Sequence, residues 1–367
     1  MPASAGVCDT GLVLPRARDY ASAKRAFGRA LERERPDSVN AVIEAFIETA
    51  SGVLAITSSC WHDTDPVSGA PVTVEALGDP PGSLEEALEY EFRRPDVNTF
   101  SDLRARGVRA MSISAQTRHR LTDSARFREM IEPRGAADEV RLSLCDPFGM
   151  WTALVVFTAR RMTPDDLRFA AELVPMATTA VRSAIAGRSL HRAAAAGPDA
   201  DGAAPSVLIV DGSDRLIAAD AIARRRLTSL PDPRDVEVPG VISFLAAQAR
   251  WDATGRPATA RMLSRDGRWF ALDASLLEGE SPDTVAVVMR PAPEAAVLDL
   301  VLRTLGLSAR EREVAALAAQ GMSTKQIAAS LMLSPWTVQD HLKSVYDKAS
   351  VSGRAELAGL AGTSAAA

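Results

Sequence analysis

The residues best suited to metal or haem chemistry lie together in one short segment near the start of the chain. Cys60, His62, Asp63 and Asp65 supply a thiol, an imidazole and two carboxylates, side chains that commonly bind transition metals. The sequence shows no second cluster of such residues that could complete a site. We therefore interpret residues 60–66 as a solvated polar loop and expect neither a metal nor a haem there.

Short motifs that carry common catalytic chemistry are absent from the sequence. There is no Gly-x-Ser-x-Gly, no Gly-x-x-x-x-Gly-Lys, no His-Glu-x-x-His and no dinucleotide-binding glycine fingerprint. We therefore expect no catalytic residues, no cofactor and no enzymatic activity.

A second group of polar residues lies near the C-terminus, on one face of a predicted helix over residues 333–348. Ser334 is a side-chain cap, and Pro335 occupies the first helical position, where its missing N–H is not needed. The inward face is predicted to hold Val338, Leu342, Val345 and Ala349. The outward face is predicted to hold Trp336, Thr337, Gln339, Asp340, Lys343, Ser344 and Asp347. Such donors and acceptors could contact base edges in a DNA major groove.

Two capped helices precede this one. Ser308 with Glu311 and Ser323 with Gln326 both have the spacing of a capping box, and Gly321 is suited to end the first of these helices. Only residues 332–334 separate the second helix from the helix that begins at Pro335. A fourth helix is expected over residues 351–361, so the C-terminus is predicted to be an all-α, four-helix helix-turn-helix unit.

Residues 307–361 closely resemble the LuxR-type (LuxR/FixJ-like) DNA-binding domain of bacterial transcription regulators. The matching motifs are Ser-x-Arg-Glu-x-Glu-Val, Gly-x-Ser-x-Lys-x-Ile-Ala, Ser-Pro-x-Thr-Val-x-x-His-Leu and Arg-Ala-Glu-Leu, in that order. Three positions differ from the usual pattern: Gln339 replaces a basic residue, Trp336 replaces Arg, Lys or a small residue, and Ala349 replaces Leu. The resemblance implies binding to double-stranded DNA as a homodimer.

The side chains expected to contact DNA fall into two groups. Phosphate contacts are predicted for Ser323, Thr324, Lys325, Ser334 and Thr337. Base-edge contacts are predicted for Gln339, Asp340 and Lys343, with Trp336 on the same face. A dimer contact is predicted for Leu357, Leu360 and Ala361, because small neighbouring residues permit close helix approach and the family resemblance points the same way. The alternative is that these last side chains close the core of the domain.

Composition places limits on the partners and on the compartment. The chain has 367 residues, 47% hydrophobic and 24% charged, which suits two or three soluble domains. A formal net charge of −5 excludes a globally basic nucleic-acid binder, so DNA attraction must be local and one copy should bind weakly. Three dispersed cysteines, Cys8, Cys60 and Cys145, and no apolar run of roughly twenty residues favour a cytoplasmic protein outside the membrane.

Residues 17–192 are predicted to form an α+β domain. We expect helices over 17–35, from Ser38, over 84–94 and from Thr163, and strands over 53–57, 71–77, 140–144 and 150–157, with a polar loop region over 98–133. Helices around an antiparallel sheet, with a late hairpin leading into a long helix, resemble the layout of GAF-type sensory domains.

A flexible linker is predicted over residues 193–205, followed by a smaller domain over 206–291. Two strands, helices, and three antiparallel strands over 258–263, 269–276 and 284–290 resemble a PAS-type domain. A phosphoacceptor receiver domain also opens with Val-Leu-Ile-Val-Asp, but the acidic pair and the later lysine that it needs are missing.

Residues 292–306 are predicted to be a helical connector. Its apolar stripe, Val297, Leu300, Val301 and Leu305, needs a partner, either the DNA-binding domain or the same segment of a second copy. Together these features favour a transcription regulator whose sensory domains bind a small-molecule effector. The alternative is an enzyme or a ligand-binding protein with a regulatory DNA-binding tail.

Overall fold

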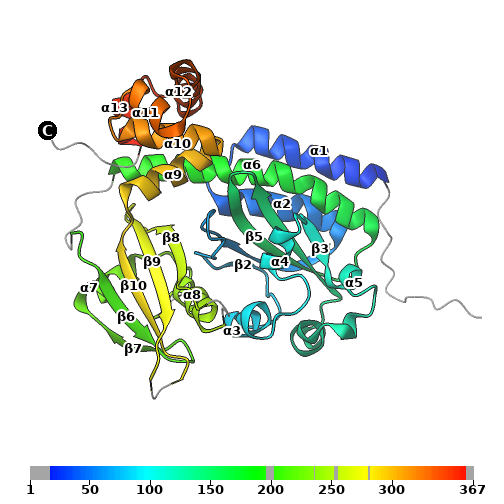
Figure 1. Cartoon of the computed structure of the whole chain (residues 1–367). Coiled ribbons are helices and arrows are strands. Elements are labelled where there is room, and N and C mark those ends of the chain that lie inside the picture. Colours follow the sequence, from blue (N-terminus) through cyan, green and yellow to red (C-terminus); the bar gives the residue numbers. More distant parts are fainter. Residues whose placement is uncertain (1–16, 196–201, 235, 252–254, 280–281, 361–367) are drawn as a thin grey trace, which may run out of the picture.

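The computed structural model describes residues 17–195, 202–234, 236–251, 255–279 and 282–360, and it places two antiparallel sheets below a small helical domain (Figure 1). The first sheet has the strand order β2-β1-β5-β4-β3 and the second has the order β7-β6-β10-β9-β8. Every strand pair in both sheets is antiparallel. The two sheets therefore share one topology, which differs from the parallel sheet of a receiver domain.

Two long helices of the first domain pack against one face of its sheet, and a third long helix packs on those two helices. The strands are β1 (Ile56–Asp63), β2 (Glu75–Leu77), β3 (Ala110–Ser112), β4 (Asp138–Asp146) and β5 (Gly149–Thr158). Helices α2 (Val39–Leu54) and α6 (Pro164–Ala195) lie on this face, and α1 (Ala17–Glu34) packs against α2 and α6. Their shared core includes Phe46, Trp61, Leu142, Leu154 and Val174, all of them buried. This is the α+β arrangement that the sequence predicts.

The other face of the first sheet is covered by the chain between β2 and β4. This segment contains the α-helices α3 (Leu84–Leu88), α4 (Phe100–Ala105) and α5 (Ile113–Gln116). It also contains the π-helices η1 (Glu89–Arg93) and η3 (Phe127–Ile131) and the short 3-10 helices η2 (Leu121–Asp123) and η4 (Glu132–Arg134). The prediction of a polar loop over 98–133 was therefore wrong in part. Short elements held by side-chain caps, such as Thr99 on Asp102 N–H at 3.3 Å, give no long periodic signal.

The predicted strand over 53–57 was correct only for its last two residues, Ile56 and Thr57, and the predicted solvated loop over 60–66 was wrong. Val53 and Leu54 end α2, and the left-handed residue Ala55 separates this helix from β1. β1 then runs through Cys60 and His62, and residues 63–66 are all buried. Both faces of this strand are covered, so the alternation of polar and apolar residues expected of a half-exposed strand is lost.

The central domain agrees closely with the prediction from the sequence. Its elements are β6 (Ser206–Val210), β7 (Leu216–Ala219), α7 (Ala221–Ser229), α8 (Gly240–Trp251), β8 (Ala258–Leu263), β9 (Trp269–Leu276) and β10 (Val285–Pro291). Helices α7 and α8 supply Leu227, Ile242 and Leu245 to a core that contains Phe270 and Leu272. The predicted linker over 193–205 overlaps the end of α6 at Ala195, and residues 196–201 lie outside the described part of the chain.

The first and central domains are joined by buried polar and aromatic contacts. Asp65, which is 1% exposed, receives three hydrogen bonds of 2.8–2.9 Å from the backbone N–H and the guanidinium of Arg261 in β8. The ring of His62 in β1 meets the ring of Phe244 in α8 edge-on, with centroids 4.9 Å apart. The two domains thus share an interface that buries the carboxylate of a charged pair.

The C-terminal helices are α9 (Glu294–Thr304), α10 (Ala309–Ala319), α11 (Thr324–Leu331), α12 (Pro335–Ala349) and α13 (Arg354–Gly359). Helix α9 packs against both α6 and α10, as Figure 1 shows. Its Leu298 and Leu302 belong to the core of the C-terminal domain, whereas Leu300 lies beside Ile185 of α6. The connector therefore packs on the C-terminal domain and on the first domain at once. None of the helices in the described ranges is both long enough and apolar enough to cross a membrane.

Candidate nucleic-acid interface

Helices α11 and α12 are joined by the tight turn that a helix-turn-helix unit requires. Ser323 caps α11 in a capping box with Gln326, and Ser334 caps α12. Met332 ends α11 in the left-handed conformation, with φ of 53°, and the next residue, Leu333, donates its N–H to the Ala328 carbonyl at 2.9 Å. The local sequence signals for both helix starts are thus confirmed.

One face of α12 is buried as the spacing predicts. Val338, Leu342, Val345 and Ala349 are all buried against α10 and α11. On the opposite face Trp336 is 78% exposed, and Gln339, Asp340, Lys343 and Asp347 are exposed as well. These exposures hold in the full chain, so the first and central domains leave this face open.

Ser344 does not belong to the open face. Its hydroxyl donates to Glu311 Oε1 at 2.6 Å, and the ammonium of Lys348 donates to both oxygens of Glu311 at 2.7–2.8 Å. Glu311 is 6% exposed and also accepts the N–H of Ser308 at 2.7 Å, which completes the α10 capping box. One carboxylate therefore caps α10 and fixes the position of α12.

The electrostatics of Glu311 reflect these contacts. Burial alone would raise the pKa of its carboxyl group, but the hydrogen bonds from Lys348, Ser344 and Ser308 outweigh burial and lower the pKa to about 2. The sequence identified Glu311 only as a capping residue. Its reach to α12 depends on the packing angle of α10 against α12, which no local pattern reports.

The predicted phosphate-contacting residues lie at the N-termini of α11 and α12. Ser323 and Lys325 are exposed, and Thr324 accepts a hydrogen bond from Arg354 at 3.2 Å. The hydroxyls of Ser334 and Thr337 lie 2.9 Å apart. These helix starts present unpaired backbone N–H groups, which favour an anion such as a phosphate.

Most arginines of this domain hold the fold together. Arg310 donates to the Leu331 carbonyl at 2.6 Å, Arg354 donates to the carbonyl of Met322, and Arg312 pairs with Asp299 of α9 at 2.8 Å. Lys325 and Lys343 are therefore the cations that remain exposed near the helix-turn-helix face. Such a small positive charge gives weak non-specific attraction to DNA.

The residues predicted to form the dimer contact differ in exposure. Leu357 of α13 is completely buried and belongs to the core of its own domain, as the alternative interpretation requires for this residue. Leu360 is partly exposed at the edge of the same core. Ala361 lies outside the described residues.

Comparison with known proteins concerns mainly this domain. Residues 305–361 match the family model described as bacterial regulatory proteins, luxR family. The C-terminal domain is a LuxR-type DNA-binding domain. The transcriptional regulatory protein UhpA of Salmonella typhimurium is 47% identical over 66 residues, which are 18% of this chain and 34% of UhpA. UhpA of Escherichia coli is 52% identical over 52 residues, 14% of this chain and 26% of that protein. The chain thus spans about a third or less of the length of these relatives.

Solved structures similar to the chain include Escherichia coli SdiA and a VqmA–ligand–DNA complex from Vibrio cholerae. SdiA is 13% identical, with 93% of this chain and 96% of SdiA covered and a TM-score of 0.28. VqmA is 18% identical, with 43% of this chain and 81% of VqmA covered and a TM-score of 0.23. We base the relationship on the sequence match of residues 305–361 alone.

The residues from Cys60 to Asp65 that suggested metal or haem chemistry make other contacts in the described part of the chain. No three His, Cys, Asp or Glu side chains in the described ranges are arranged to hold a metal ion. Cys60 and His62 instead face a cavity under the first sheet, Asp63 pairs with Arg188 of α6, and Asp65 pairs with Arg261. Cys8 is outside the described part of the chain.

Proposed function

We propose that the chain is a cytoplasmic transcription regulator whose C-terminal domain binds operator DNA as a homodimer, under the control of a small-molecule effector. The observation that carries this proposal is the open polar face of α12, presented by a LuxR-type domain and left uncovered by the other two domains. The low positive charge of one copy supports dimeric binding, because two copies double the number of phosphate contacts.

The proposed DNA contacts divide into positioning and reading. Lys325 at the start of α11 contacts a phosphate, whereas Gln339 in the exposed face of α12 pairs with the edge of an adenine. Asp340 and Lys343 read neighbouring bases, and Trp336 packs against a sugar or a thymine methyl group beside them. Of Lys325 and Gln339, only Gln339 makes a contact that depends on the DNA sequence.

The experiment that tests this function begins with mapping the sites that the protein occupies across its genome. Binding to the mapped sequence is then measured for Lys325→Ala and Gln339→Ala, with Gln320→Ala, an exposed glutamine beyond the end of α10, as the matched control. Lys325→Ala should weaken binding to all sequences and reduce the salt slope by about 1, and Gln339→Ala should cost roughly 1–3 kcal/mol at one base position. An unchanged sequence preference in Gln339→Ala would show that α12 enters the groove by another face.

The control of DNA binding is proposed to come from the two preceding domains. The shared strand order supports a GAF-like first domain and a PAS-like central domain. Contacts that could transmit a change are present, because Arg303 of α9 donates to the Phe148 carbonyl in the β4–β5 turn at 2.9 Å. A coupling free energy of about 1–3 kcal/mol would be enough to switch operator occupancy.

A further inference from the structure

A cavity of about 280 Å³ lies under the face of the first sheet that points away from α2 and α6. Its floor is formed by alternate residues of β1, β4 and β5, including Cys60, Glu139 and Val155. The walls come from the segment between β2 and β4, and the greater part of the lining is apolar. A cavity of this kind can enclose a small organic molecule.

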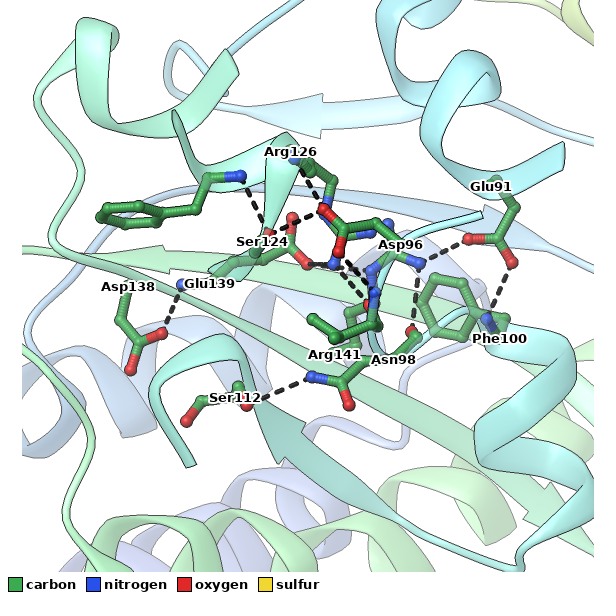
Figure 2. Close-up of polar contacts among 12 residues, drawn as sticks. Glu91, Asp96, Asn98, Phe100, Ser112, Ser124, Arg126, Asp138, Glu139 and Arg141 are labelled. Carbon is green, nitrogen blue, oxygen red and sulfur yellow. Dashed lines mark hydrogen bonds and ion pairs between the residues drawn. The ribbon is translucent and has the colours of Figure 1, made fainter. Parts of the chain in front are cut away.

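Two charged side chains on the floor have unused hydrogen-bonding atoms. Glu139 is 1% exposed, and its Oε1 accepts hydrogen bonds from Arg126 Nη2 at 2.8 Å and from Arg141 Nε at 2.9 Å (Figure 2). Arg141 Nη1 donates to Glu91 and, at 3.2 Å, to the Asn98 carbonyl. No described residue bonds to Glu139 Oε2 or to Arg141 Nη2, although both side chains are buried and line the cavity. The floor therefore offers an acceptor and a donor side by side.

The charges around the cavity balance one another. Glu75, Glu91 and Glu139 face Arg104, Arg141 and Arg234 in its lining. His62 adds no charge at neutral pH, because burial lowers its pKa to about 4. Its Nδ1 lies 3.0 Å from the Thr73 carbonyl, which can only accept, so Nδ1 carries the proton and Nε2 is left as an acceptor. The formal charges of the six charged lining side chains therefore sum to zero, which favours an uncharged ligand.

One wall of the cavity belongs to the central domain. Phe244 and Gln248 of α8 line it together with the first-domain residues, and Phe244 is 5% exposed. Phe244 packs with Leu88 of α3 in a small apolar cluster that spans both domains and touches the His62 ring. A molecule in the cavity therefore contacts both domains.

We propose that this cavity binds a small uncharged molecule with an amide-like edge, and that α8 of the central domain closes the site. The ligand C=O accepts from Arg141 Nη2, the ligand N–H donates to Glu139 Oε2, and an apolar ring or chain fills the space toward Phe244. Lactams and hydroxylated nitrogen heterocycles in their keto form have this edge. The binding site is inferred from the geometry of the cavity alone. Only the identification of its ligand as the effector rests on the proposed function.

Three related probes test the chemical class with the full chain. ε-Caprolactam has the complete edge, N-methyl-ε-caprolactam lacks the donor, and 6-aminohexanoate is the charged, ring-opened form. Titration calorimetry and ligand-observed NMR should show binding of the lactam with a Kd on the order of 1 mM, as expected for a fragment of this size. The N-methyl compound should bind at least about tenfold more weakly because Glu139 Oε2 loses its donor, and the charged form should not bind. Equal binding of the lactam and its N-methyl form, or no binding of the lactam, would overturn the proposal.

Variants test the location of the site and its closure by α8. Ala153→Leu places a larger side chain on the floor and should abolish lactam binding, while circular dichroism confirms the fold. Phe244→Leu should weaken binding about fivefold or more, whereas the matched control Phe270→Leu, in the same domain but outside the cavity lining, should leave it unchanged. Hydrogen exchange of unmodified protein provides a readout that needs no substitution, because saturating lactam should slow exchange in α8. Binding that survives Ala153→Leu, or lactam that leaves exchange in α8 unchanged, contradicts the proposal.

Operator binding measured in parallel separates this inference from the proposed function. If the chain binds the lactam as described but its operator affinity does not change, the proposed site is supported. Control of DNA binding by this ligand class is then refuted. If the chain binds its operator but none of the probes, the DNA-binding function is supported and the proposed site is refuted.

Discussion

Replacement of Glu311 by Gln should loosen α12 without unfolding the rest of the chain. The pKa of this carboxyl group falls from 4.5 to about 2, and that change corresponds to roughly 3 kcal/mol of interaction with the charged form. Lys348 is 40% exposed, so solvent screens part of this, and we expect a loss of about 2 kcal/mol from the C-terminal domain at pH 7. The side-chain oxygen of the introduced glutamine can still accept the backbone N–H of Ser308. The loss of stability therefore reports the contacts between residue 311 and α12.

Hydrogen exchange of the α12 amides measures this loss directly in the full chain. A loss of about 2 kcal/mol should speed exchange about 30-fold if α12 opens with its domain. The matched control is Glu313→Gln on the same helix, where the carboxylate is 53% exposed and pairs only with Arg310. This control should change exchange less than about twofold, because exposed ion pairs contribute little.

Acid provides a second test of the role of Glu311. The folded pKa lies below the ordinary value, so the stabilisation is complete above about pH 4.5 and is lost as the pH falls toward 2. The difference in α12 exchange between unmodified protein and Glu311→Gln, corrected for intrinsic exchange rates, should therefore shrink across that interval. Equal acceleration by both glutamine variants, or a difference that persists at pH 2, would refute the proposed anchoring of α12.

Three further predictions concern other parts of the chain. Burial lowers the pKa of His62 from 6.5 to about 4, so unmodified protein should lose roughly 2–3 kcal/mol of unfolding free energy as the pH falls from 6.5 to 4, and His62→Gln should lose correspondingly less in denaturant titrations. Asp65→Asn should cost about 2–4 kcal/mol by weakening the buried pair with Arg261, and calorimetry should then show separate transitions for the first and central domains; a single unshifted transition would contradict this. Leu360→Glu should abolish cooperative binding to a paired operator half-site while circular dichroism stays unchanged, and an unaltered binding curve would remove the proposed dimer contact.

The sequence predicts the C-terminal domain well because its signals are local. Ser308, Ser323 and Ser334 each cap the helix that they were expected to begin, and the buried stripe of α12 contains the four predicted residues. Ser344 was misplaced because its exposure depends on Glu311, which is distant in the sequence. Side chains of one helix can be assigned to faces by spacing, but their partners on other helices cannot.

Prediction failed where tertiary packing covers polar residues. Asp63 and Asp65 suggested a solvated loop, yet each is buried against an arginine more than a hundred positions away, Arg188 and Arg261. The cavity had no signal in the sequence either. Its floor combines Glu139 with strands that are remote in the chain, and its closing wall comes from a different domain.

The position of α9 decides where the DNA-binding module can be cut from this chain. Leu298 and Leu302 complete the core of the C-terminal domain, so a chimera that joined another sensor at residue 306 would remove part of that core and expose Leu307 and Val314. A junction near Pro293, before α9 begins, keeps the core intact. The transferred piece would then carry the α9 face that now meets α6, and its new host must cover Val297, Leu300 and Val301. Exchange of N-terminal domains among chains built this way is therefore constrained by the surface that receives α9, in addition to the proposed DNA contacts of α12.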